Sequence, residues 1–175
     1  RRPFWPRRAS PSRISSTILA EKASRSPGLR EVITPLSTTT WESSHLPPAL
    51  MTSAGVECLL LIVHYAYVSA QAQQGIGPAT DAIASARLVG DKALLRKALT
   101  FGGVVQMETG NLPAATESCA EALDLAREIA DRFAEGVLWN NLGLALQYAA
   151  HYGDAIRCYE RSIAMAGEDP AMRMS

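Results

Sequence analysis

The sequence repeats itself at an interval of forty residues, and this feature restricts most strongly how the chain can fold. When the sequence is shifted by forty residues, Gly103 falls on Gly143 and Ala115 falls on Ala155. A repeated unit of this length is one supersecondary unit, which buries its apolar face against its neighbours. Residues 51–175 are therefore predicted to form one domain built of such units.

Each unit has the pattern of two helices. In the last unit, Trp139, Leu142 and Leu146 lie at i, i+3 and i+7, which is one face of a helix. The period breaks at residues 151–154, and a second helix is predicted from there to Gly167, a residue suited to a helix C-terminus. Small residues are expected where the two helices cross, because a large side chain there would hold the axes apart. The predicted repeat core consists of Gly103, Ala115, Ala122, Trp139, Leu142, Gly143, Leu146, Ala155, Tyr159 and Ser162, with Trp139 largely buried.

The boundaries of the preceding unit are marked by turn and capping residues. Gly90 is suited to end one helix, and Asp91 is suited to cap the next. Gly110 separates the two helices of the unit, and Asn111 is predicted to cap the second one, with Pro113 in its first turn. The repeats are expected at about 91–131 and 132–167.

An earlier, degenerate repeat is expected at about 54–90, with helices at 59–70 and 79–89. Its register is ambiguous. Pro78 aligns with Pro113 at an offset of 35 residues, whereas Ala86 aligns with Ala126 at 40. A second helix that is shorter by about one turn would reconcile the two offsets.

Residues 1–50 differ in composition from the rest of the chain. They hold eight basic and three acidic residues and seven of the ten prolines, with no sustained apolar period. Such a segment buries too little apolar surface to offset its ordering entropy, so a disordered basic arm is predicted. Two alternative interpretations of residues 1–50 stay open. One is an artefact of the gene model, with Met51 as the native start, and the other is an organelle transit peptide.

The motif of the last unit resembles a known repeat family. Trp139-x-x-Leu142-Gly143-x-x-Leu146, followed by Ala155-x-x-x-Tyr159-x-x-Ser162, is similar to the pattern of the tetratricopeptide repeat. The unit at 96–135 matches through Gly103, Gly110, Ala115 and Ala122. The family repeat has about 34 residues, and the longer period found here resembles the arrays of bacterial signalling regulators. The resemblance implies an all-α solenoid of antiparallel helix pairs that forms a right-handed superhelix.

The resemblance also implies where a partner binds. In such arrays the first helix of each pair lines a concave groove, and the face of that helix turned away from its neighbours contacts the ligand. An asparagine and a glutamine in this strip offer hydrogen bonds to a peptide, and its apolar residues offer contact area. The groove candidates are Lys97, Thr100, Val104, Met107, Glu108, Val137, Asn140, Leu144, Gln147 and Tyr148.

Sites for catalysis, metals or cofactors are not indicated. His45, His64 and His151 are far apart in the sequence and lack a spacing that holds a metal. Cys58, Cys119 and Cys158 lie in predicted helices, where cysteine behaves as a small buried hydrophobe. Cys158 has Arg157 and Arg161 near it, so a reactive thiol is least excluded there. We therefore predict no enzyme activity, no cofactor and no metal.

Charge, hydropathy and cysteine usage limit the partner and the compartment. The chain has 17 basic and 17 acidic residues, which argues against nucleic acid as the partner. Its longest apolar stretch is shorter than the ~20 residues of a membrane span. An odd number of cysteines without a paired motif favours a reducing, cytoplasmic compartment.

The sequence thus predicts a protein-binding module within a larger bacterial regulatory protein. The alternative is the regulatory region of a multidomain enzyme or transcription regulator whose catalytic or DNA-binding domain lies outside this sequence. Residues 169–175, with Asp169 and Pro170, resemble the start of a truncated helix. Ile156, Tyr159, Ile163 and Met165 make the last predicted helix apolar, so self-association through an uncapped repeat end is also expected.

Overall fold

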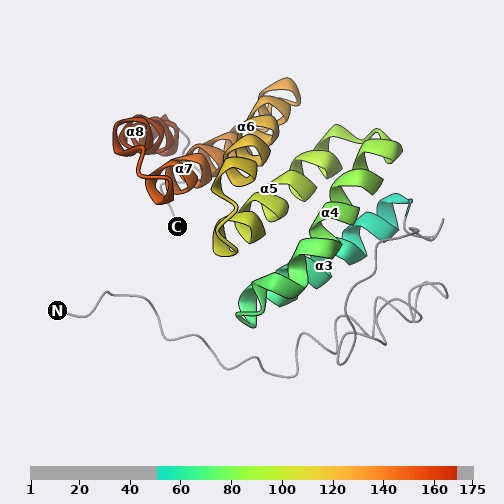
Figure 1. Cartoon of the computed structure of the whole chain (residues 1–175). Coiled ribbons are helices and arrows are strands. Elements are labelled where there is room, and N and C mark those ends of the chain that lie inside the picture. Colours follow the sequence, from blue (N-terminus) through green and yellow to red (C-terminus); the bar gives the residue numbers. More distant parts are fainter. Residues whose placement is uncertain (1–50, 169–175) are drawn as a thin grey trace. The chain divides into compact units, whose positions relative to one another are not determined.

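A computed structural model describes residues 51–168, which all belong to one compact unit of the chain. This part consists of six helices joined by short turns and contains no strand, which confirms the all-α prediction (Figure 1). The predicted arm (1–50) and the predicted truncated helix (169–175) lie outside the described residues. The helices are α3 (Ser53–Val68), α4 (Ala72–Val89), α5 (Lys92–Glu108), α6 (Leu112–Glu128), α7 (Arg132–Tyr148) and α8 (Tyr152–Glu168).

The period of forty residues extends through all three helix pairs. The second helices begin at residues 72, 112 and 152, and the first helices end at 68, 108 and 148. The expected shortening of the earliest second helix was wrong, because α4 has 18 residues. Pro78 lies buried inside α4, whereas Pro113 lies at the start of α6, so the two prolines are not equivalent. Pro78 removes one hydrogen bond from α4, but the helix continues past it.

The turns between helices share one backbone conformation. Gly90 and Gly110 have φ values of 76° and 82°, and Gly90 ends α4 as predicted. Ala70, Ala130 and Ala150 occupy the corresponding positions with φ between 56° and 62°. The break predicted at 151–154 holds only for His151, since the turn lies at residues 149–151 and α8 already begins at Tyr152. Gly167 lies within α8 and does not end it.

Two of the first helices start at an aspartate whose side chain caps them. Asp91 accepts hydrogen bonds from the backbone N–H groups of Ala93 and Leu94, at 2.9 and 3.0 Å. Asp131 caps α7 with one such bond, which it accepts from the N–H of Ala134 at 3.0 Å. Asn111 makes no such bond at α6, so its predicted capping role was wrong. Pro113 removes one of the two N–H groups that a capping side chain normally reaches, which leaves only that of Ala114 for Asn111.

Each helix packs on the next one along the chain, and the first helices also contact one another. Besides the consecutive pairs, α3 packs on α5 and α5 packs on α7. We call α3, α5 and α7 the first-helix layer. Its contacts with α4, α6 and α8 bury most of the core. One cluster joins α5, α6 and α7 and contains Leu99, Ala122, Leu123, Ala126, Ala134 and Leu138.

The predicted burial of Trp139 was wrong in degree. Trp139 is half-buried at the edge of this cluster, and the guanidinium carbon of Arg127 lies 5.0 Å from the centre of its ring. Leu138, its neighbour in the sequence, is fully buried instead. A helical residue that lies about 100° around the axis from the core centre buries only one side of a large ring.

Small residues let the helices of a pair approach closely. A Cβ atom placed on Gly143 would lie 2.7 Å from Cε1 of Tyr159, and one on Gly103 would lie 3.0 Å from Sγ of Cys119. These distances are shorter than an ordinary contact of about 3.5–4.0 Å. Among the predicted core residues, Gly103, Ala115, Ala122, Gly143 and Ala155 are buried, and Trp139, Leu142, Leu146, Tyr159 and Ser162 are half-buried.

Candidate protein-binding surface

The groove candidates lie on α5 and α7, and they differ in how much of each side chain solvent reaches. Val137, at 39% exposure, and Tyr148, at 52%, are apolar side chains open to contact. Six of the candidates are exposed: Lys97, Glu108, Val137, Asn140, Gln147 and Tyr148. Three others, Thr100, Val104 and Leu144, are half-buried.

Met107 was wrongly predicted as a groove contact. It is 6% exposed and packs against Ala115 of α6 and Ala145 of α7. Val104 and Leu144 border the same cluster. Met107 therefore connects α5, α6 and α7 and leaves little surface for a ligand.

Several polar groups of the strip already have partners. The Thr100 hydroxyl donates to the backbone carbonyl of Arg96 at 2.8 Å. Lys97 forms an ion pair with Glu57 of α3, at 3.4 Å. The Gln147 side-chain oxygen accepts from the Tyr159 hydroxyl at 2.7 Å. Asn140 and the amide nitrogen of Gln147 are thus the candidates best placed to hydrogen-bond a partner.

Helix α3 continues the surface, which the sequence analysis missed. His64 is exposed, and its ring meets that of Phe101 of α5 edge-on, with 5.9 Å between the ring centres. Tyr67 and Val68 are each 40% exposed. Val68 precedes the exposed candidate Glu108 by forty residues, so the repeat offset was the signal that would have identified this end of α3. It was obscured by the ambiguous register of the first repeat.

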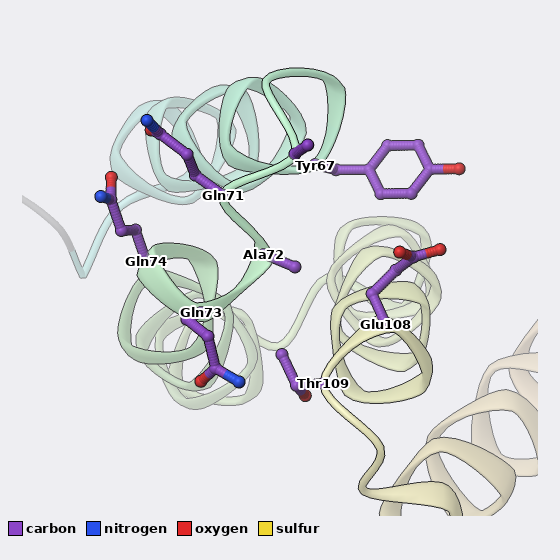
Figure 2. A pocket seen from close by; sticks show the side chains of 8 residues that line it. Tyr67, Gln71, Ala72, Gln73, Gln74, Glu108 and Thr109 are labelled. Carbon is purple, nitrogen blue, oxygen red and sulfur yellow. The ribbon is translucent and has the colours of Figure 1, made fainter.

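A cavity of about 360 Å³ lies where α3 turns into α4, beside the C-terminal end of α5. Its walls include three glutamine side chains from the turn and the start of α4 (Figure 2). Figure 2 shows Glu108 of α5 on the same side of the cavity as the ring of Tyr67. The cavity is lined by Tyr67, Ala70, Gln71, Ala72, Gln73, Gln74, Glu108 and Thr109.

The cysteines are buried thiols. Cys58, Cys119 and Cys158 are buried in three different helices. Burial raises the pKa of Cys119 to about 11. Burial also raises the pKa of Cys158, helped by the Asp154 carboxylate and opposed by Arg157. Because a nucleophilic cysteine requires a lowered pKa, the arginines near Cys158 do not activate it.

The described part of the chain shows no group of three or more histidine, cysteine or acidic side chains that is able to hold a metal ion. None of its helices is both long and apolar enough to cross a membrane. The candidate surface is instead a strip of exposed apolar and amide side chains on neighbouring helices. Such a strip is suited to contact with another protein.

The sequence model of one protein family, described as the tetratricopeptide repeat, matches residues 94–168. These residues form a tetratricopeptide repeat segment. The match covers α5 to α8 and confirms the resemblance found in the sequence. No curated protein matched the sequence. Tetratricopeptide repeats generally mediate protein–protein interaction and are not generally catalytic, so the segment has the architecture of an interaction module.

Proposed function

We propose that the tetratricopeptide segment binds a peptide or protein segment along the exposed side of the first-helix layer. The observation that carries this proposal is the exposed strip on α7, where Val137, Asn140 and Tyr148 lie outside the packed core. On α5, exposed Lys97 and Glu108 extend the strip. Apolar contact from Val137 and Tyr148 supplies binding energy, and the Asn140 amide fixes the orientation of a peptide backbone.

The charges on this surface describe the kind of segment that fits it. Lys97 is neutralised by Glu57, and Glu108 adds a carboxylate near Tyr67. A strongly acidic peptide therefore meets no free cluster of cations in this layer. A segment with apolar residues and few charges is the better match.

Peptides selected from a random library against the full chain test this proposal. Asn140→Ala and Tyr148→Ala are expected to weaken the binding of the selected peptides about tenfold or more, which corresponds to about 1.4 kcal/mol. Tyr152→Ala is the matched control, because Tyr152 is 63% exposed but lies on α8. The proposal is wrong if Tyr152→Ala weakens binding as much as Tyr148→Ala does.

The proposal includes a cellular context. The period of forty residues supports a place in a bacterial regulatory protein, because arrays of that kind have long repeats. The odd number of cysteines and their burial in three different helices support a cytoplasmic location.

We also propose self-association through α8. Ile163 is 71% exposed, whereas Leu123, the equivalent residue one repeat earlier, is 3% exposed and packs in the cluster that joins α6 to α7. Ile156 is also exposed on this helix, at 56%. A second copy of the chain that packs on this face would cover it as α7 covers α6.

A further inference from the structure

A second concave site lies away from the first-helix strip, where α6, α7 and α8 meet. It is a cleft of about 600 Å³, which is within the usual range of about 300–1,000 Å³ for ligand sites. Trp139 and Leu146 of α7, together with Cys158 of α8, supply its apolar part. Three of its seven lining residues are arginines: Arg127, Arg157 and Arg161.

The repeat itself shows what is unusual about this cleft. One repeat earlier, Arg87 of α4 and Glu121 of α6 form an ion pair with 2.8 Å between nitrogen and oxygen, and two arginine nitrogen–carboxylate contacts hold it. The residues forty positions later are Arg127 and Arg161. The position that Glu121 has in the earlier pair is thus occupied by a second arginine, Arg161. Two cations now border a cleft in which the repeat pattern would place an arginine and a glutamate.

The acidic side chains around the cleft neutralise two of its three arginines. Arg127 pairs with Glu135 at 3.1 Å and with Asp124 at 3.4 Å. Arg157 pairs with Asp154 on its own helix.

Arg161 differs from the other two arginines. Within residues 51–168, it makes no hydrogen bond or ion pair with another side chain. Its guanidinium therefore has its charge and its donors available to a ligand.

We propose that this cleft binds an anionic group, a carboxylate or a phosphate, carried by a protein partner, and that Arg161 holds it. Arginine presents several N–H donors in a planar fork that matches both carboxylate and phosphate oxygens. Leu146, Cys158 and the Trp139 ring contact an apolar residue beside the acidic one. This site is separate from the first-helix strip, so either site can be disproved without the other.

Fluorescence of Trp139 tests the proposal in the full chain. Trp5→Phe and Trp41→Phe leave Trp139 as the single tryptophan, and it lines the cleft. Four probes are titrated: inorganic phosphate and three acetylated peptides that carry two glutamates, two glutamines or one phosphoserine between leucines. The glutamate or the phosphoserine peptide, or both, should change the emission with a Kd below about 1 mM, and the glutamine peptide should bind at least tenfold more weakly. The two anionic peptides separate carboxylate from phosphate as the preferred group.

Two variants provide the decisive comparison. Arg161→Glu restores the arginine–glutamate combination of the preceding repeat, so it should keep the melting temperature and lose at least tenfold in affinity for the anionic peptides. Lys92→Glu makes the same change of net charge outside the cleft and should leave their affinity within twofold. The proposal is overturned if neither the glutamate nor the phosphoserine peptide binds below about 1 mM. It is also overturned if the glutamine peptide binds as well as the others, or if the two variants lose affinity equally.

Discussion

The residue that reverses the chain between helices has a left-handed backbone at every turn within residues 51–168. At Gly90 and Gly110 this conformation meets no Cβ, but at Ala70, Ala130 and Ala150 it does. A residue with a Cβ loses roughly 1–2 kcal/mol in the left-handed region. Alanine at three of the five turns therefore lowers the stability of the array without changing its fold.

Substitution of Ala130 by glycine should stabilise the protein. Relief of the left-handed strain outweighs the larger entropy of the unfolded chain, so we expect a net gain of about 0.5–1 kcal/mol. Gly90→Ala is the reverse control, because φ at Gly90 is 76° and a Cβ there meets no atom within 4 Å. It should lose a similar amount. Urea unfolding of both variants checks the prediction, and a destabilised Ala130→Gly variant would contradict it.

Burial of Cys119 should make stability depend on pH in the alkaline range. Its pKa is about 11 when folded, against 9.0 for the free group. The unfolded chain therefore loses this proton at a lower pH than the folded chain. The stability that the protonated Cys119 thiol contributes is therefore complete below pH 9 and declines as the pH rises toward 11.

Comparison with Cys119→Ala isolates that contribution. The difference in unfolding free energy between wild type and variant should fall by roughly 1–2 kcal/mol between pH 9 and pH 11. Tyrosines and lysines titrate in both proteins and cancel in the difference. A difference that stays constant over this range would show that the thiol of Cys119 is accessible to solvent.

At the residue scale, sequence pattern identified faces of helices better than it identified individual contacts. Gly103 and Gly143 were found because close helix approach demands small residues at the same repeat position. Met107 was misplaced because its position on the helix lies near the boundary between the strip and the core, where the neighbouring helix decides burial. Trp139 was misplaced for the same reason in the opposite direction.

At the scale of single helices, the two kinds of N-terminus should differ in energy. Asp91→Ala removes a side chain that accepts from two backbone N–H groups and should cost about 0.5–2 kcal/mol. Asn111→Ala should cost less, because Asn111 makes no capping bond. Thermal or urea unfolding of the two variants measures the difference. Equal losses would mean that Asn111 caps α6 in solution.

The helices from α5 to α8 were predictable because apolar periodicity and turn residues agree there. In α3 and α4 they disagree. Buried Leu59, Leu60, Ile62 and Val63 are close together in α3, so a single apolar face is hard to identify. Pro78 suggests a helix start by its local chemistry, whereas packing extends α4 on both sides of it. Tertiary contacts decided those boundaries.

At the scale of the whole array, equivalent residues differ according to whether a further helix covers them. Leu123→Ser should cost about 2–4 kcal/mol, since Leu123 is buried between α6 and α7. Ile163→Ser, at the equivalent position of α8, should change stability by less than about 0.5 kcal/mol. The Ile163 variant should also associate less at high concentration, as measured by light scattering. A large loss of stability at Ile163, or unchanged association, would contradict the proposed role of α8.

The central claim is that partners bind along the exposed side of the first-helix layer, and a chemical-shift map of a selected peptide on the full chain tests it most directly. The largest amide shifts are expected on α5 and α7, at Lys97, Val137, Asn140 and Tyr148. Residues such as Leu88 of α4, which is 68% exposed on a second helix, should remain unperturbed. Shifts confined to α4, α6 and α8, with none on α5 or α7, would contradict the account.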